Sequence, residues 1–277
     1  MTRPAQLSIK RTHGLGNLIM LLPVIDRLTE SGIAVHLVTR PEWVEAISPD
    51  RRAVDFDETP RGDTIDLDAA TLKLIPGAHR TLEFAHLLNI QGPFSPPRLS
   101  VPKAWSHPFR RYAGALIVAP ESGHPARSWP VARLHALTTL LTAEPVVLTG
   151  LHPTPALPCR ADLRGQLSLP QVLGLLEHAR AVLCFDSGML HLALARSVPT
   201  LAIFGGIDPT YRIFPEQRAR VIQAALACCP CNKAETCRGR YPCLTELTSA
   251  QVAEELASID QVVTREIRRI EMPACVS

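Results

Sequence analysis

Short apolar runs alternate along this chain with longer segments in which apolar residues recur at helical spacing. Runs of four to six apolar residues favour buried strands, and apolar residues three or four positions apart favour helices. In the first 90 residues this pattern predicts strands at 6–10, 34–39, 53–57 and 64–68, and helices at 18–31, 41–47 and 79–90. Strands and helices that alternate in this way predict a parallel sheet with both faces covered.

A proline-rich segment without periodicity, residues 91–107, separates this first series from a second one, and we interpret it as a linker. The second series predicts strands at 115–120, 145–150, 181–186 and 200–205, helices at 130–142, 168–179 and 189–196, and a helical region at 248–270. The chain is therefore predicted to be an α/β protein with two Rossmann-like domains, 1–107 and 108–277.

Composition and charge exclude some functions. The net charge of +3 over 277 residues is too small to indicate a nucleic-acid partner. The apolar run 18–25 is too short to span a membrane and contains Pro23, and Asp26 and Arg27 follow it where a signal peptide has small residues. We expect a cytoplasmic protein whose cysteines are reduced.

Ligands of open parallel sheets bind beyond the carboxyl ends of the strands. Here that rule indicates four segments: 13–17, 120–129, 186–191 and 205–209. In the third segment, Asp186 ends an apolar strand and Ser187–Gly188 open a helix. Free N–H groups at such a helix start suit a phosphate, and the Asp186 carboxylate suits sugar hydroxyls. The alternative is that Asp186 and Ser187 only cap the helix.

Five segments, in order, resemble one enzyme family. "HGLGNLIMLLPVIDRL" is similar to its opening loop and helix, and "APESGHPARSWPVARLHAL" to its P-G-x-x-x-x-K-x-W-P segment. "DLRGQLSLPQVLGLLEHARAVLCFDSG" is similar to the usual lead-in, and "FDSGMLHLALARSVPTLAIFGGIDP" to D-[ST]-G-x-x-H-L-A-x-A-x-x-x-P-x-x-x-x-[FY]-G-x-x-D-P. "CCPCNKAETCRGRYPCL" is similar to its cysteine-rich tail. The chain thus resembles glycosyltransferase family 9, the heptosyltransferase-like enzymes.

This resemblance implies a GT-B fold, in which two Rossmann-like domains face a cleft. It implies inverting transfer of a sugar from a nucleotide-sugar donor, commonly ADP-heptose, to a lipopolysaccharide core or related lipid-linked glycan. No cofactor or catalytic metal is expected, and the protein is expected at the inner face of the cytoplasmic membrane. Protein groups must then neutralise the leaving diphosphate.

Several residues of the second domain are candidates for donor binding. Arg127 stands where the family has lysine, which keeps the positive charge but changes the geometry; the alternative is a solvated surface arginine. Met189 follows Gly188 at the helix start, and His191 matches the family histidine, although a packed histidine is the favoured interpretation. Asp208 matches the family's G-x-x-D-P, but an aspartate before proline also starts ordinary turns.

The cysteine-rich tail carries a second pattern. Cys228, Cys231, Cys237 and Cys243 form C-x2-C-x5-C-x5-C, which suits a tetrahedral structural zinc or iron site. The alternative is a cluster kept for packing or local redox chemistry. In either case the segment is expected to be structural and remote from the chemistry.

Asn17 departs from the family, whose opening loop carries an aspartate as the expected general base. An amide cannot accept a proton at neutral pH. If the chain is an enzyme, His13 in the same loop or Glu121 at the end of strand 115–120 is expected to serve as the base. The alternative is a protein that keeps the fold and binds nucleotide-sugars, or acts as a scaffold, without catalysis.

Overall fold

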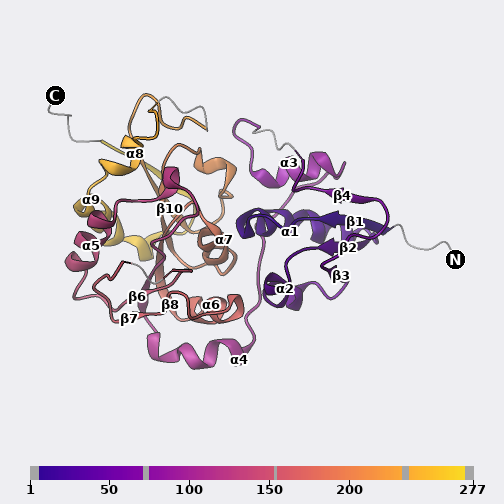
Figure 1. Cartoon of the computed structure of the whole chain (residues 1–277), viewed down its shortest axis with the longest axis horizontal. Coiled ribbons are helices and arrows are strands. Elements are labelled where there is room, and N and C mark those ends of the chain that lie inside the picture. The colour runs from indigo at the N-terminus through magenta and orange to yellow at the C-terminus, as the bar shows by residue number, and fades with distance from the viewer. Residues whose placement is uncertain (1–5, 71–74, 153–154, 233–236, 272–277) are drawn as a thin grey trace.

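Two separate parallel sheets organise the computed structural model, which describes residues 6–70, 75–152, 155–232 and 237–271 (Figure 1). The strands are β1 Gln6–Lys10, β2 Ala34–Val38, β3 Val54–Asp57, β4 Thr64–Asp66, β5 Ala115–Val118, β6 Val146–Leu148, β7 Ala161–Asp162, β8 Ala179–Phe185, β9 Thr200–Phe204, β10 Ala219–Ala224 and β11 Glu266–Ile270. The helices are α1 Leu15–Glu30, α2 Pro41–Ile47, α3 Arg80–Leu87, α4 Lys103–Ser106, α5 Val131–Leu140, α6 Leu169–Leu176, α7 Gly188–Ala195, α8 Pro242–Thr245 and α9 Ser249–Leu256.

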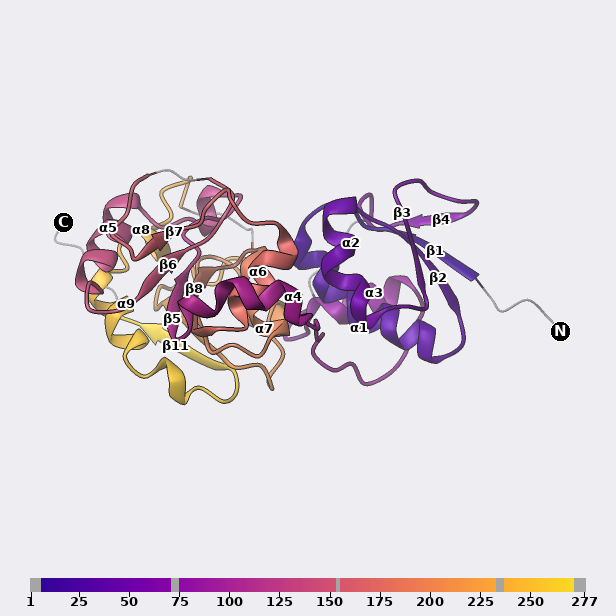
Figure 2. The same cartoon turned by 90° about the horizontal axis from the view of Figure 1, so that it is seen from below.

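The two sheets lie in two halves of the molecule, side by side (Figure 2). The N-terminal sheet has the order β3-β2-β1-β4 and the C-terminal sheet the order β11-β10-β9-β8-β5-β6-β7. Every strand pair is parallel. The α/β class and the strands and helices predicted up to residue 205 are confirmed, with ends that shift by a few residues.

The sequence prediction was wrong at the C-terminal end, where 248–270 is not helical throughout. Only α9 and a short 3-10 turn at Ile259–Gln261 are helical there, and β11 follows as an edge strand paired with β10. Strand β10 itself was missed because Arg220 and Gln223 interrupt its apolar run. Both side chains are nevertheless buried, and hydrogen bonds offset part of the cost: Arg220 donates to Glu266 at 2.9 Å, and Gln223 donates to the Gly205 carbonyl at 2.5 Å.

The segment interpreted as a linker ends in a helix that belongs with the C-terminal half. Helix α4 packs on α6, where a Cβ atom added to Gly174 would lie 2.1 Å from the backbone carbonyl oxygen of Trp105 (Figure 2). His178 Nε2 donates to the Ser106 carbonyl at 2.9 Å. The chain is therefore anchored to the second sheet before residue 107, and the predicted domain boundary stays a prediction.

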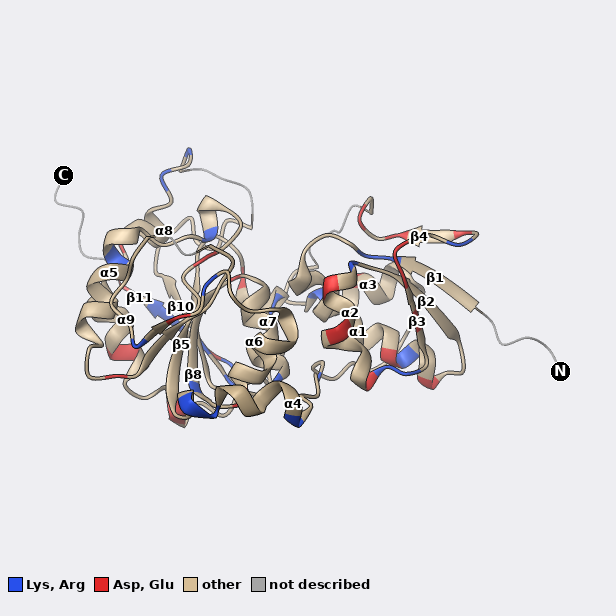
Figure 3. Ribbon diagram, turned by 60° about the horizontal axis from the view of Figure 1, so that its bottom comes forward, with Lys and Arg blue, Asp and Glu red and all other residues tan. Residues whose placement is uncertain are grey.

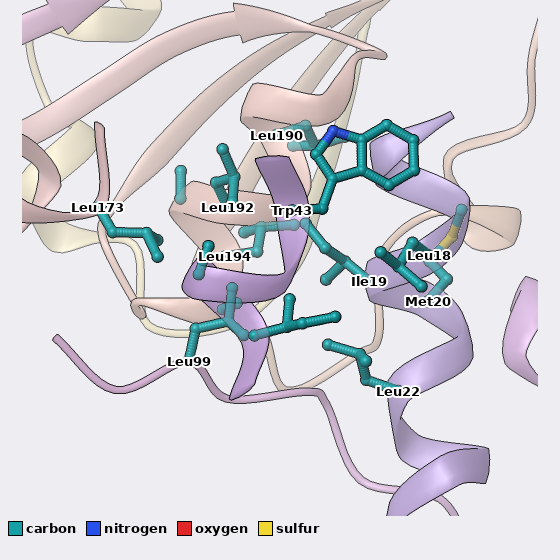
Figure 4. Close-up of a cluster of buried hydrophobic side chains, with 14 of the residues drawn as sticks. Leu18, Ile19, Met20, Leu22, Trp43, Leu99, Leu173, Leu190, Leu192 and Leu194 are labelled. Carbon is teal, nitrogen blue, oxygen red and sulfur yellow. The ribbon is translucent and has the colours of Figure 1, made fainter. Parts of the chain in front are cut away.

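One apolar cluster runs across the contact between the halves (Figure 4). Helix α1 contributes Leu18, Ile19 and Leu22, which face leucines of α7, and a second cluster fills the opposite face of the C-terminal sheet. Glycine permits the close approach of the two helices, because a Cβ atom on Gly16 would lie 2.5 Å from Cδ2 of His191. The described residues contain no helix whose length and apolar character would allow it to cross a membrane.

Candidate functional site

A cavity of about 500 Å³ opens between the two halves, beside the contact of α1 with α7. The N-terminal half contributes Asn17 and Arg80 to its wall. The C-terminal half contributes His124, Ala126, Arg127, Asp186, Gly206, Ile207, Arg212, Tyr241, Pro242 and five cysteines. Figure 3 shows basic positions on both sides of this contact. The cavity is therefore lined by residues of both halves, and some of them, such as Asp186 and Gly206, lie just beyond the carboxyl ends of strands.

Asp186 organises the charged part of the cavity. It follows β8 directly and is 3% exposed. Its Oδ1 accepts a hydrogen bond from Nε of Arg212 at 3.1 Å, and its backbone carbonyl accepts one from Nη1 of Arg127 at 3.0 Å. Two arginines are therefore held beside one carboxylate, which leaves this wall with an excess of positive charge.

Arg127 is placed by the turn that precedes α5. Residues Pro125–Arg127 form a 3-10 turn, and two positions later Trp129 is buried with its Nε1 donating to the Leu247 carbonyl at 3.1 Å. The Arg127 guanidinium lies 3.9 Å from Oδ2 of Asp186 and remains 36% exposed toward the cavity. It is thus neither a fully solvated surface arginine nor a fully neutralised one.

Ser187 and Gly188 form the start of α7, as the sequence predicted. The Ser187 side chain makes no cap hydrogen bond to this helix, so the alternative that it only caps α7 is wrong. Its Oγ is buried and has no hydrogen-bond partner among the described residues. Gly188 lies against Leu15, which is 3.3 Å from the position of an added Cβ. A side chain at position 188 would therefore press on Leu15 where the two halves meet.

Arg80 and Arg212 both line the cavity, although the sequence did not indicate either of them. Arg80 begins α3 and is 5% exposed, while Arg212 lies beyond the predicted 205–209 segment and is 8% exposed. Burial, and then the neighbouring charge of Arg212, lowers the pKa of Arg80 to about 10. An arginine at a helix start ordinarily points into solvent, so only its position against the other half distinguishes Arg80.

The opening loop places Asn17 in the cavity wall, whereas His13, four residues earlier, lies outside this wall and is exposed. The His13 side chain is 72% exposed, and its Nδ1 lies 3.2 Å from Oδ2 of Asp68. Asp68 also accepts the backbone N–H of His13 at 3.0 Å. Hydrogen bonds from Thr12 and His13 lower the pKa of Asp68 against the opposing effect of burial. A largely buried carboxylate, also missed from the sequence, thus orients the His13 ring.

Glu121 does not lie in the cavity wall. Its carboxylate accepts the backbone N–H groups of Leu151 at 3.0 Å and His152 at 2.8 Å. The side chain therefore turns toward the neighbouring loop after β6, where it supports the backbone at Gly150 (φ 152°). In this structure the Glu121 carboxylate therefore does not line the cavity, where the expected base would act.

Ser187 and Gly188 do not line the cavity either, and three further candidates also lie outside its wall. His191 is 6% exposed, packs against Gly16 and has its pKa lowered to about 4 by burial, which agrees with a packed histidine. Asp208 caps the turn at Pro209–Tyr211 by accepting the N–H of Thr210 at 2.9 Å. Met189 is half-buried and packs against the shared apolar core.

The cysteine-rich tail lines the cavity, which the sequence did not predict. Cys229 and Cys243 share a hydrogen bond, and the Cys231 sulfur lies 2.5 Å from where a Cβ of Gly206 would be. Within the described part of the chain, no three metal-ligating side chains come close enough to hold an ion. The arrangement therefore does not fit the zinc or iron site predicted at Cys228, Cys231, Cys237 and Cys243.

Comparison with known sequences gives a consistent result. The profile of Glycosyltransferase family 9 (heptosyltransferase) matches residues 79–241. Lipopolysaccharide heptosyltransferase 2 of Salmonella typhimurium is 30% identical over 113 residues, which are 41% of this chain and 32% of that protein. The match therefore spans about a third of the length of that curated relative.

Solved structures share the fold. A glycosyltransferase family 9 protein from Veillonella parvula superposes with a TM-score of 0.74 at 13% identity, covering 94% of this chain and 99% of the other. The iron-containing heptosyltransferase TibC of enterotoxigenic E. coli, in complex with ADP-D-beta-D-heptose, superposes with a TM-score of 0.73 at 17% identity, covering 94% and 77%. These likenesses identify the arrangement of two Rossmann-like halves as a GT-B fold.

Proposed function

The chain belongs to glycosyltransferase family 9, and on this premise we propose that it transfers a sugar from a nucleoside-diphosphate sugar to a glycan. The observation that carries the proposal is the cavity between the halves, where Arg127 and Arg212 flank Asp186 beside the start of α7. Guanidinium groups and free helix N–H groups suit a diphosphate, and they stabilise the charge that develops as it leaves.

We propose heptose as the sugar, ADP as the nucleotide, and a lipopolysaccharide core or related glycan as the acceptor. The support is the similarity to lipopolysaccharide heptosyltransferase 2 of Salmonella typhimurium and the ADP-heptose complex of TibC, whose fold this chain shares. A lipid-linked acceptor would bring the protein to the inner face of the cytoplasmic membrane.

The proposed chemistry is a single displacement with inversion at the anomeric carbon. The acceptor hydroxyl attacks this carbon and loses its proton to Nε2 of His13, while the bond to the diphosphate oxygen breaks and its electron pair leaves with the nucleotide. Asp68, 3.2 Å from Nδ1 of His13, holds the ring in the orientation that exposes Nε2 and stabilises the resulting cation. The Asn17 amide hydrogen-bonds a hydroxyl but cannot take its proton.

Single-turnover transfer rates, measured with ADP-heptose and a core-glycan acceptor, test this assignment. Loss of a general base slows transfer by about 10²–10⁴-fold, which we expect for His13→Ala. His107→Ala replaces another exposed histidine, outside the cavity, and is the matched control. In His13→Ala, a second change of Asn17→Asp should recover part of the rate, because it supplies the carboxylate that the family carries.

An unchanged rate in His13→Ala would refute the base assignment. Absence of transfer by the wild type, together with transfer by Asn17→Asp, would refute the enzyme proposal itself. That result would identify the chain as a binding protein on the scaffold of an enzyme.

A further inference from the structure

Arg80 belongs to the N-terminal half but lines the cavity together with arginines of the C-terminal half. Its position is fixed from both sides of the contact. The preceding residue, His79, stacks on Phe214 with ring centroids 3.8 Å apart and hydrogen-bonds the backbone of Arg212. The following residue, Thr81, donates from Oγ1 to the Met20 carbonyl of α1 at 2.6 Å. The backbone at Arg80 is therefore held in place from both halves.

Three buried donor groups in this region retain unused hydrogen-bonding capacity, as does one buried acceptor, Oδ2 of Asp186. Nε of Arg80, Nη1 of Arg212 and Oγ of Ser187 have no hydrogen-bond partner among the described residues. Glu83 lies 3.8 Å from Nε of Arg80, and Asp186 bonds the other side of Arg212, so each guanidinium has an acid nearby. The acids balance part of the charge but leave these donors unused.

Bringing two guanidinium groups together in a buried site costs free energy, because each loses hydration and each repels the other. The effect on Arg80 is visible in its pKa, which burial and Arg212 together lower to about 10. An anion in the cavity would relieve both costs. A diphosphate has several oxygens on two phosphorus atoms and can accept bonds from more than one direction at once.

From this convergence of donors we infer that Arg80 binds the diphosphate of the sugar donor, from the half of the molecule opposite to Arg127 and Arg212. The inference rests on the proposed function. When the anomeric carbon–oxygen bond breaks, the electron pair moves onto the terminal phosphate, and Arg80 stabilises that charge more strongly than the charge of the intact donor. The nucleotide thereby bridges the two halves.

Calorimetric titration of the full chain with ADP, AMP and adenosine tests the inference. Arg80→Gln should weaken ADP binding by about tenfold to a hundredfold and AMP binding less, and should leave adenosine binding unchanged. Arg80→Lys keeps the charge without the planar fork, and its loss should be intermediate. Arg110→Gln, an exposed arginine outside the cavity wall, is the matched control and should bind like the wild type.

The phosphate dependence separates binding from a purely structural role, which would weaken all three ligands alike. Equal losses for ADP and adenosine would therefore overturn the inference, as would unchanged ADP affinity in a folded Arg80→Lys or Arg80→Gln protein. If Arg80→Gln does not fold, Arg80→Lys decides the matter. Failure of the wild type to bind any nucleoside diphosphate would overturn the proposed function as well, whereas the preceding outcomes leave it standing.

Discussion

The two halves of this molecule meet through two regions of opposite character. Between α1 and α7 the contact is apolar and closely packed: Leu18 and Leu190 are fully buried, and Gly16 admits His191 to near contact. In the adjoining cavity, Arg80 and Arg212 are also buried but retain donor atoms without hydrogen-bond partners among the described residues. The first region is complete without a ligand, and the second is not.

This difference assigns separate tasks to neighbouring parts of one interface. Burial of apolar surface contributes about 25 cal/mol per Å², so the packed region stabilises the association of the halves. Buried polar groups without partners cost free energy and persist where function requires them. Changes in the packed region should therefore alter stability, and changes in the cavity should alter ligand binding.

The largest effect is expected from opening the packed region. Leu18→Ala deletes buried atoms that face α7 and should lower the free energy of unfolding by about 2–5 kcal/mol. Urea denaturation measures this loss, and calorimetry should show little change in the ADP affinity of the folded fraction. A Leu18→Ala protein of unchanged stability with reduced ADP affinity would contradict the view that the packed region serves stability and the cavity serves binding.

Acid should weaken the packed region through His191, whose pKa burial lowers to about 4. The unfolded chain takes up this proton near pH 6.5, so the free energy of unfolding should fall as pH drops from about 6.5 to about 4, by roughly 3 kcal/mol. Urea midpoints of wild type and His191→Gln across this range measure the contribution. Identical pH dependence in the two proteins would show that His191 does not carry it.

Binding should respond to the cavity arginine that stands in place of the family lysine. Arg127→Ala removes one charge-assisted contact and should cost about 1.5–3 kcal/mol in ADP binding, or roughly tenfold to a hundredfold. Because this side chain is partly exposed, the unfolding free energy should change little. Unchanged ADP affinity would remove Arg127 from the proposed diphosphate site.

The smallest effect is expected from metal chelation. Since no three ligands converge in the described residues, a chelator should leave the thermal midpoint unchanged, and the half-buried Cys231 and Cys237 should react with a thiol reagent in the native protein. Metal analysis is the check. About one zinc or iron per chain, with a lower midpoint after chelation, would restore the site that the cysteine spacing predicted.

Local patterns were sufficient to predict most strands and the candidate residues at their ends. Strand β9 is an unbroken apolar run, and the start of α7 at Ser187–Gly188 follows from the residues themselves. Strand β10 was missed because the partners that pair its buried Arg220 side chain and the Nε2 of Gln223 are supplied only by the fold.

Residues of the candidate site could be predicted only where a single segment of the chain determines their position. Arg80 acts through its position against the other half, and Asp68 reaches His13 across 55 residues of sequence. Glu121 shows the converse limit. Its place at a strand end could be predicted from the sequence. The direction of its carboxylate could not, because the backbone N–H groups of Leu151 and His152 determine it.

Hydrogen–deuterium exchange with and without ADP tests most directly whether the cavity between the halves is the donor site. We expect slower exchange on both sides of the cavity, at the start of α3 and in residues 126–128, 186–190 and 206–212. Exchange should be unchanged in β2 and β3 of the N-terminal sheet and in α9, which lie away from the cavity wall. Binding of ADP with protection elsewhere, or in the C-terminal half alone, would contradict a donor site shared by both halves.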